Sequence, residues 1–330
     1  MAEIDLIRDA IKEAGSIRKA EGLLNISERT IRRRLHEAVR SELEIDEVPS
    51  IVDIDELVQE RIRKFARLQK ATNASVVREI RLKTNKPIGV GFFGDTHMDD
   101  DGTNIEKVLR HAELFNGQNE GLYGFFLGDV WNNWVGRLTR LWADQSTNGR
   151  EAQALVELFF NKVYWLAVLL GNHDVWNGKT DIIEYMLKAN TSISAAHEQR
   201  VRLVFPNGRS VLIHARHKFP GHSQWTRQFG QIKAAMLGGA ADIYVGGDKH
   251  VSGYSNGWHD GVKKMWHALQ VASYKEIDEY PVELGLSPAD LYQCPVAIID
   301  PKADKPLNFI RWEFDPEEGA ERLAWSRSKA

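Results

Sequence analysis

Apolar residues recur at helical spacing through the first forty residues. Apolar stripes over residues 4–11, 17–24 and 28–39 are separated by Gly15 and by a short turn at 25–27. In the third stripe the arginines fall on the outer side and the aliphatic residues on the inner side. This pattern predicts three short helices that pack together as a small unit of their own.

The composition changes after the third stripe. Residues 42–60 are rich in Asp and Glu and are broken by Pro49, which indicates a linker. A further helical stripe over residues 55–70 leads into the rest of the chain. We therefore expect three parts: a helical unit at 1–41, an acidic linker with a helix at 42–74, and a large domain at 75–330.

Short apolar runs separated by helical segments dominate the large domain. They predict an α/β (α+β) fold, a sandwich of two mixed sheets flanked by helices. Ligands of such sheets bind at the carboxyl ends of the strands. The predicted strands are 88–93, 124–127, 164–169, 210–213, 243–245, 296–299 and 309–314.

The composition limits the classes of protein to which the chain can belong. The 330 residues are 43% hydrophobic and 27% charged, as in ordinary globular proteins. Cys294 is the only cysteine, which excludes an internal disulfide and a thiolate metal site. The longest apolar run, 163–170, is too short for a bilayer, and the start does not resemble a signal peptide, so we expect a cytoplasmic protein without a membrane partner. The net charge of −3 means that a nucleic-acid partner has to be argued from local charge.

Side chains that bind metals follow five of the predicted strands. Singly, each group has an ordinary explanation as a turn or a structural histidine. Five strand ends that each offer Asp, Asn or His are unusual for turn chemistry alone, so together they predict a metal site. The groups are Gly94-Asp95-Thr96-His97, Gly128-Asp129, Gly171-Asn172-His173-Asp174, His214 with His217, and Gly247-Asp248-Lys249-His250.

This series resembles the pattern of the calcineurin-like metallophosphoesterase family, over roughly residues 88–255. The resemblance implies a two-metal phosphoesterase in which two cations, about 3.5–4 Å apart, share the attacking hydroxide. It assigns Asp95, His97 and His250 to one metal, Asp129 to the bridge, and Asn172 with His217 or His214 to the other. Ligands of oxygen and imidazole suit Mn²⁺, which we favour, and also Fe, Zn²⁺, Ni²⁺, Co²⁺ or Mg²⁺.

The resemblance also implies roles for neighbouring residues. His173 would protonate the leaving oxygen and Asp174 would orient His173. Asn132, Asn133 and Lys249 are candidate contacts to substrate phosphate, although Lys249 also fits a solvated surface lysine.

Two positions leave alternatives open. Asp248 stands where the family has a histidine, so either its carboxylate takes over the coordination and favours harder ions, or the second metal site is weak. His217 shares the inward parity of Ile213 and Ala215, which favours it over His214 as the ligand.

The N-terminal stretch SIRKAEGLLNISERTIRRRLHEA resembles a helix-turn-helix of the Fis and resolvase type. The resemblance implies that Arg29, Thr30, Arg32 and Arg33 contact DNA from the second helix of the pair. The alternatives are a solvated arginine face and a protein-docking module. Helix-turn-helix units often act as dimers, but the sequence identifies no interface between two copies.

A DNA-reading head joined to a phosphoesterase favours a phosphodiesterase or nuclease that acts on nucleic acid. The alternatives are a phosphomonoesterase for proteins or nucleotides, and a nonenzymatic DNA-bound regulator. The pairing of domains is reminiscent of proteins encoded by phages.

Overall fold

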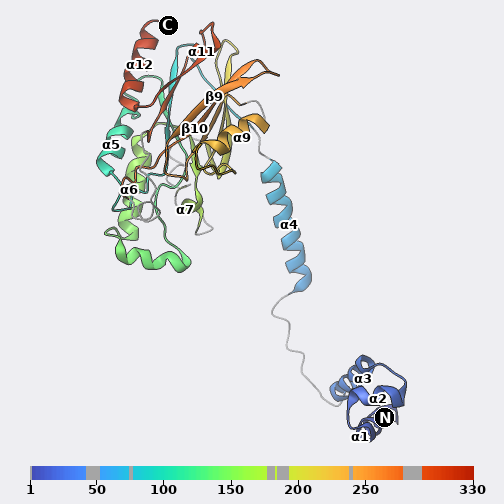
Figure 1. Ribbon diagram of the computed structural model, residues 1–330. Coiled ribbons are helices and arrows are strands. Elements are labelled where there is room, and N and C mark those ends of the chain that lie inside the picture. Colours follow the sequence, from blue (N-terminus) through green and yellow to red (C-terminus); the bar gives the residue numbers. More distant parts are fainter. Residues whose placement is uncertain are drawn as a thin grey trace. The chain divides into compact units, whose positions relative to one another are not determined.

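The structure, a computed structural model, describes residues 2–41, 53–73, 77–176, 183, 193–237, 241–277 and 292–330. The chain divides into two compact units, Met1–Ala71 and Thr72–Ala330, and each is described by itself (Figure 1). The first part of the predicted linker, residues 42–52, lies outside the described residues.

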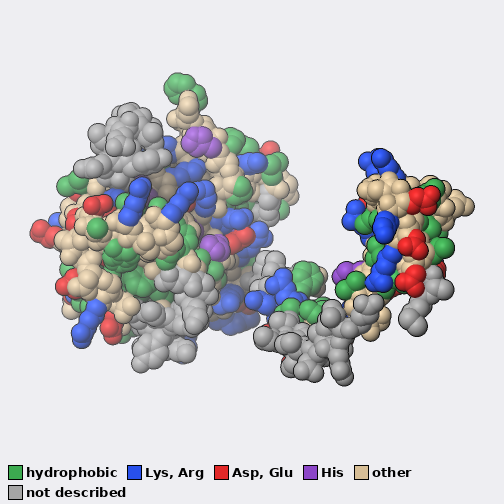
Figure 2. All heavy atoms as spheres, turned by 90° about the horizontal axis from the view of Figure 1, so that it is seen from below, with side chains coloured by type: hydrophobic (Ala, Val, Ile, Leu, Met, Phe, Trp, Pro, Cys, Tyr) green, Lys and Arg blue, Asp and Glu red, His purple; other side chains and the backbone are tan. Residues whose placement is uncertain are grey.

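The three predicted N-terminal helices are confirmed. Ile7, Ala20 and Ile31, one from each helix, are buried together at the centre of the bundle. The Ser16 hydroxyl accepts the N–H of Lys19 at the start of the second helix, and Asn25 ends it with φ 54°. In this unit, Lys and Arg side chains gather on one side and Asp and Glu on the other (Figure 2). The helices are α1 (Ala2–Ala14), α2 (Ile17–Leu24) and α3 (Glu28–Ser41).

The predicted helix before the large domain is also present, as α4 (Ile54–Asn73). Its start is capped by Asp53, whose Oδ1 accepts the N–H groups of Asp55 and Glu56 at 2.9 and 3.0 Å. Such a cap satisfies backbone donors that the helix itself cannot pair.

Two sheets form the larger unit, as predicted, and each of them has six strands. One has the order β12-β11-β2-β3-β4-β5, in which β2 to β5 are parallel and β11 runs antiparallel to both of its neighbours, β2 and β12. Its strands are β2 (Ile88–Phe93), β3 (Leu122–Phe126), β4 (Trp165–Leu170), β5 (Ile193–Ala196), β11 (Val296–Ile299) and β12 (Ile310–Glu313).

The second sheet has the order β1-β6-β7-β8-β10-β9, with β7, β8 and β10 parallel. Its strands are β1 (Arg78–Arg81), β6 (Glu198–Val204), β7 (Ser210–Arg216), β8 (Ile243–Gly246), β9 (Gly253–His259) and β10 (Lys264–Gln270). The sequence prediction missed β1, β5, β6, β9 and β10, because these strands lack a continuous apolar run. In β6, for example, buried and half-buried positions alternate.

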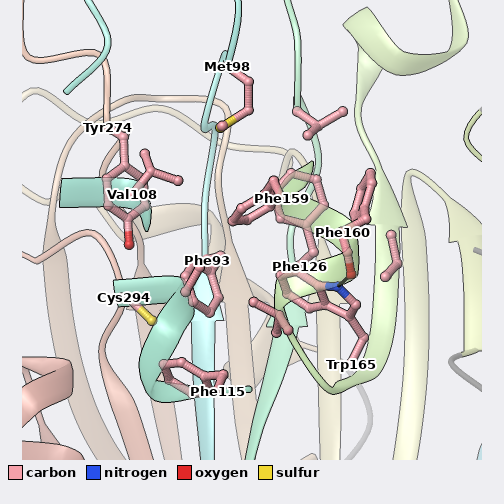
Figure 3. Packing of buried hydrophobic residues seen from close by; sticks show 14 of the residues in the cluster. Phe93, Met98, Val108, Phe115, Phe126, Phe159, Phe160, Trp165, Tyr274 and Cys294 are labelled. Atoms are coloured by element: carbon pink, nitrogen blue, oxygen red, sulfur yellow. Dashed lines mark hydrogen bonds between the residues drawn. The ribbon is translucent and has the colours of Figure 1, made fainter. Parts of the chain in front are cut away.

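Successive residues of the strands face different layers of the sandwich. Phe92 points between the two sheets, where it packs with Ile213 and Val245, whereas Phe93 points outward. Around Phe93, aromatic rings such as Phe126 and Phe159 fill the space beneath the outer helices (Figure 3). The alternation follows from the period of two in a strand.

Helices cover both outer faces (Figure 1). α5 (Ile105–Leu114), α6 (Gly149–Lys162) and α12 (Pro316–Ser328) pack on the first sheet, and α9 (Phe229–Leu237) packs on the second. The short elements are α7 (Asn172–Val175), α11 (Pro306–Phe309) and the 3₁₀ helix η1 (Gly136–Asp144). None of the described helices has the length and apolar character needed to cross a bilayer.

His111 on α5 makes the stability of the larger unit depend on pH. Its Nδ1 lies 2.8 Å from the Tyr274 hydroxyl, and burial lowers the pKa of His111 from 6.5 to about 4. The unfolded chain therefore binds more protons than the folded chain between these pH values, so stability falls as the pH drops from 6.5 towards 4. We expect His111→Gln to reduce the loss of melting temperature between pH 7 and pH 5. The exposed His222 provides the control, and an equal loss of melting temperature in His111→Gln, His222→Gln and the parent chain would contradict this account.

Candidate metal centre

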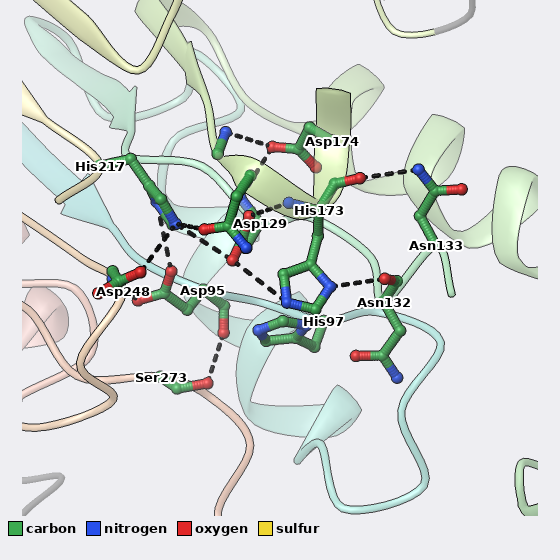
Figure 4. Close-up of polar contacts among 12 residues, drawn as sticks. Asp95, His97, Asp129, Asn132, Asn133, His173, Asp174, His217, Asp248 and Ser273 are labelled. Carbon is green, nitrogen blue, oxygen red and sulfur yellow. Dashed lines mark hydrogen bonds and ion pairs between the residues drawn. The ribbon is translucent and has the colours of Figure 1, made fainter. Parts of the chain in front are cut away.

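Loops at the carboxyl ends of neighbouring parallel strands bring the candidate ligands together. β2, β3 and β4 are parallel neighbours, and Asp95, Asp129 and Asn172 follow their ends. β7 and β8 are parallel neighbours in the other sheet, and His217 and Asp248 follow theirs. The carboxyl ends of parallel strands meet at one edge. Both sheets therefore direct polar side chains to the same place (Figure 4).

The backbone has an unfavourable conformation at several of these positions. The φ angles of Asp95, His97, Asp129, Asp248 and His250 are 35°, 39°, 58°, 68° and 52°. This left-handed region is costly for residues other than glycine, and such strain concentrates at functional sites. The surrounding fold holds these five side chains in place against local backbone preference.

Glycines beside the candidate ligands are required by close packing. A Cβ atom at Gly171 would lie 2.1 Å from Asp129 Oδ1, and one at Gly128 would lie 2.6 Å from the Gly171 nitrogen. Gly128 also has φ 108°. The Gly-Asp and Gly-Asn pairs of the sequence are therefore steric requirements of this site.

One group of donors includes two histidines. The Nε2 atoms of His97 and His250 lie 3.2 Å apart. Burial, reinforced by His250, lowers the pKa of His97 well below 6.5, so the ring is neutral. Asp95 is fully buried, and its Oδ1 has no hydrogen-bond partner among the described residues. A neutral imidazole and a buried carboxyl oxygen without a hydrogen bond are both donors that suit a divalent transition-metal ion.

A second group surrounds His217. The His217 Nδ1 donates to the Leu127 carbonyl at 2.9 Å, so Nε2 faces the site. This Nε2 lies 3.1 Å from Asp129 Oδ2, 3.0 Å from Asn172 Oδ1 and 3.8 Å from Asp248 Oδ1. Neighbouring ligands of an ion held at about 2.1 Å lie about 3 Å apart. The arrangement is therefore suited to a cation, and Asp248 lies within reach of the same position.

The charges of the cluster are compatible with a bound cation. Ligand atoms of Asp95, Asp129 and His217 all lie within 4.8 Å of one another, and the three residues are buried. Burial raises the pKa of Asp95 well above 3.8. Burial also opposes charge on Asp129 and His217, but their mutual attraction outweighs it, lowering the pKa of Asp129 and raising that of His217 to about 10. Buried carboxylates are stable beside positive charge, which a divalent ion supplies.

His214, the alternative ligand, is not part of this cluster. Its Nε2 bonds Glu198 Oε1 at 2.8 Å, and its ring packs against Phe219 and Tyr244 on the outer side of the sheet. His214 has the opposite parity along β7 to Ile213, which points between the sheets. The structure thus excludes His214 and brings His217 into the site.

Asp174 does not orient His173, so this part of the sequence prediction is corrected. Its carboxylate accepts the N–H groups of Gly171 and Asp129 at 2.8 Å each and that of Val130 at 3.0 Å. These bonds join the loops that follow β3 and β4. The role of Asp174 is to hold the candidate ligands in position.

A backbone carbonyl orients His173 instead. The His173 Nδ1 donates to the Asn132 carbonyl at 2.6 Å, and the opposite nitrogen, Nε2, lies 3.8 Å from Asp129 Oδ2. The Trp176 ring packs on the imidazole with centroids 3.9 Å apart. His173 therefore presents one nitrogen to the candidate metal centre.

The two predicted substrate asparagines have different positions. The Asn132 side chain donates to Asp100 Oδ2 at 2.8 Å and lines an open cleft. Asn133 is buried and donates to the His173 carbonyl at 2.7 Å. Both side chains are buried; Asn132 borders the cleft, and Asn133 stabilises the loop of His173.

Lys249, the third predicted substrate contact, has a structural position. Its Nζ donates to the carbonyl oxygens of Arg227 and Gly221 at 3.1 and 3.4 Å. It therefore holds the loop that follows His217, and the structure does not place its ammonium group toward the cluster.

A cleft of about 780 Å³ opens beside the cluster. This volume lies within the range of small-molecule sites. The cleft wall includes His97, His173 and His250 from the candidate centre, the apolar residues Trp134, Leu141 and Ile277, and the charged residues Asp100, Asp101, Asp144 and Lys275.

The sequence prediction missed Lys275, whose Nζ lies 3.1 Å from Asp100 Oδ2 in this cleft. Lys275 follows β10, a strand that was not predicted, so no expected strand end pointed to it. If the β9–β10 hairpin had been predicted, the end of β10 would have pointed to Lys275.

The predicted DNA contacts lie on α3. Arg29 is exposed, whereas the Thr30 hydroxyl lies 2.9 Å from Ser27 Oγ. Arg32 forms an ion pair with Glu28 at 2.7 Å, and Arg33 lies 3.6 Å from Glu37. The ion pairs of Arg32 and Arg33 are exposed and weak, so they leave both guanidinium groups accessible to phosphate.

Comparisons with known proteins give a distant structural resemblance. No protein-family model matches the chain, and no curated protein matches its sequence. The structure of the calcineurin-like phosphoesterase YfkN from Bacillus subtilis is similar over 74% of this chain and 97% of that chain, with 11% sequence identity and a TM-score of 0.37.

Proposed function

We propose that the chain is a metal-dependent phosphoesterase that hydrolyses phosphodiester bonds, with nucleic acid as the class of substrate. The observation that carries the proposal is the buried cluster of Asp95, Asp129 and His217, extended by the facing nitrogens of His97 and His250. Asp129 would bridge two divalent ions. Asn172, His217 and Asp248 would complete one site, and Asp95, His97 and His250 the other. Bound ions would supply Lewis acidity and lower the pKa of water.

Side chains near the candidate metal centre would control the transfer of a proton to the substrate. The Asn132 carbonyl retains the Nδ1 proton of His173, so only Nε2 can exchange a proton with the substrate. A protonated Nε2 would donate to the leaving oxygen as the phosphoester bond breaks. Packing against Trp176 restricts the ring to this orientation.

Three features of the chain support nucleic acid as the substrate. Trp225, in the loop that follows His217, is 93% exposed, and exposed aromatic rings can stack on bases. Lys218, in the same loop, has a largely exposed side chain although it pairs with Asp248 at 2.8 Å. The basic side of the α1–α3 unit supports a DNA-reading role for that unit (Figure 2).

One observation supports a second candidate. Asp100, Asp101 and Asp144 line the cleft, and their carboxylates repel a long polyanion. A phosphomonoesterase that takes a single nucleotide fits such a cleft, because the carboxylates can accept hydrogen bonds from base amino groups.

Two histidines three residues apart provide a matched test. With Mn²⁺ present, His217→Asn should lower hydrolysis of bis-p-nitrophenyl phosphate by at least about 100-fold, because a metal ligand is removed. His214→Gln should retain the activity, because His214 lies outside the cluster. Equal activity of the two variants would contradict the metal assignment. Cleavage of p-nitrophenyl phosphate in preference to the diester would favour the second candidate.

The DNA-reading role of the N-terminal unit is tested by salt dependence. Removing Arg29 and Arg33 together by substitution with Ala should weaken binding to duplex DNA. The slope of log affinity against log salt should fall by about 0.9 for each phosphate that the protein no longer neutralises. Hydrolysis of the small diester should not change, because the proposed ligands lie beyond residue 94. Arg8→Ala on α1 is the control, and an unchanged slope in the double variant would exclude α3 as the reader.

A further inference from the structure

Lys275 is the only lysine or arginine among the described residues that line the cleft beside the candidate metal centre. The acidic groups of the cleft wall are the carboxylates of Asp100, Asp101 and Asp144. A phosphate ester that enters the cleft is negatively charged, so these carboxylates repel it. Among the lysines and arginines of the chain, Lys275 is therefore the one whose place in the cleft wall lets its ammonium group offset this repulsion.

Backbone contacts hold Lys275 beside the loop that follows β2. The Ser273 hydroxyl donates to the Asp95 carbonyl at 2.6 Å and accepts the N–H of Lys275 at 3.0 Å (Figure 4). The Tyr274 N–H donates to the same Asp95 carbonyl at 3.3 Å. Lys275 itself pairs with Thr103 in an isolated β-bridge. These contacts fix the backbone of Lys275 against the loop that supplies the candidate ligand Asp95.

The Asp100 carboxylate holds the side chain of Lys275. The Lys275 Nζ lies 3.1 Å from Asp100 Oδ2, and 19% of its side chain is exposed. Asp100 Oδ2 also accepts the Asn132 amide at 2.8 Å, and Oδ1 accepts the Gly102 N–H at 2.9 Å. Both carboxylate oxygens are thus fixed. An ammonium group carries three N–H donors, so an ion pair with one carboxylate oxygen is compatible with a second, anionic partner.

We propose that Lys275 binds a non-bridging oxygen of the substrate phosphate, with Asp100 as its positioning residue. The inference rests on the proposed phosphoesterase function and names a residue of its substrate site. His97, His173 and His250 line the same cleft as Lys275, which places the ammonium group on the open side of the candidate centre. The contact takes the role that the sequence analysis gave to Lys249. It would be present before and after hydrolysis, so it acts on affinity more than on the chemical step.

Binding of inorganic phosphate tests this assignment separately from hydrolysis. In the full chain loaded with Mn²⁺, Lys275→Gln should weaken phosphate binding, measured by calorimetry, by at least about tenfold, because a charge-assisted hydrogen bond is lost. The KM for bis-p-nitrophenyl phosphate should rise while kcat changes little. Lys275→Arg keeps the charge and should retain most of the affinity. Manganese content and melting temperature should match those of the parent chain.

Lys107→Gln is the matched control. The Lys107 Nζ pairs with Glu276 Oε1 at 2.9 Å, one residue after Lys275, but Lys107 does not line the cleft. This variant should bind phosphate as the parent chain does. Equal phosphate affinity of Lys275→Gln and a parent that hydrolyses the diester would overturn this assignment alone, as would a similar loss in Lys107→Gln. A parent chain that hydrolyses neither diester nor monoester would overturn the proposed function, and this assignment with it.

A double variant separates direct binding from electrostatic screening. In Lys275→Gln the charge of Asp100 loses its cation and would by itself repel phosphate. Asp100→Asn removes this charge and keeps an oxygen that can accept the Asn132 amide. If Lys275 contacts the phosphate, the double variant Asp100→Asn/Lys275→Gln should still bind phosphate weakly. Recovery of the parent's phosphate affinity in the double variant would show that Lys275 only screens Asp100, and would overturn the proposed contact.

Discussion

The burial of Asp95 and Asp129 close together is the constraint on which the larger unit depends. Two carboxylates in a low-dielectric interior repel one another, and each loses its hydration. Their pKa values move in opposite directions, because His217 stabilises the charge of Asp129 while burial dominates at Asp95. A positive charge among these groups relieves both effects, and the positions of the surrounding donors fit a metal ion.

The fold holds these unfavourable groups through hydrogen bonds between loops. Asp174 joins the loops that follow β3 and β4. The Asp248 N–H donates to Asp95 Oδ2 at 2.8 Å, which joins the two sheets, and the Ser273 hydroxyl donates to the Asp95 carbonyl at 2.6 Å. The left-handed φ angles at the same loops show that tertiary contacts determine the local conformation here.

The sequence predicted those parts of the fold in which local pattern and tertiary environment agree. β2 and β4 are buried along their whole lengths, so each is a continuous apolar run followed by ligating residues. The alternation of side chains along β7 likewise distinguished His217 from His214, because alternate residues of a strand face opposite sides of the sheet. β9 is partly exposed and rich in polar residues, so its pattern resembles a loop. The bonds made by Asp174 and Lys249 depend on loops distant in sequence, and neither residue type nor spacing indicates where such side chains point.

Metal stoichiometry tests the central claim most directly. The full chain should be stripped of metal, loaded with Mn²⁺, freed of excess ion by gel filtration, and measured by elemental analysis and electron paramagnetic resonance. A bridging Asp129 predicts two manganese ions per chain and a spectrum of magnetically coupled ions. Retention of no manganese, or of a single uncoupled ion, would contradict the assignment of Asp95, Asp129 and His217 to a two-metal centre.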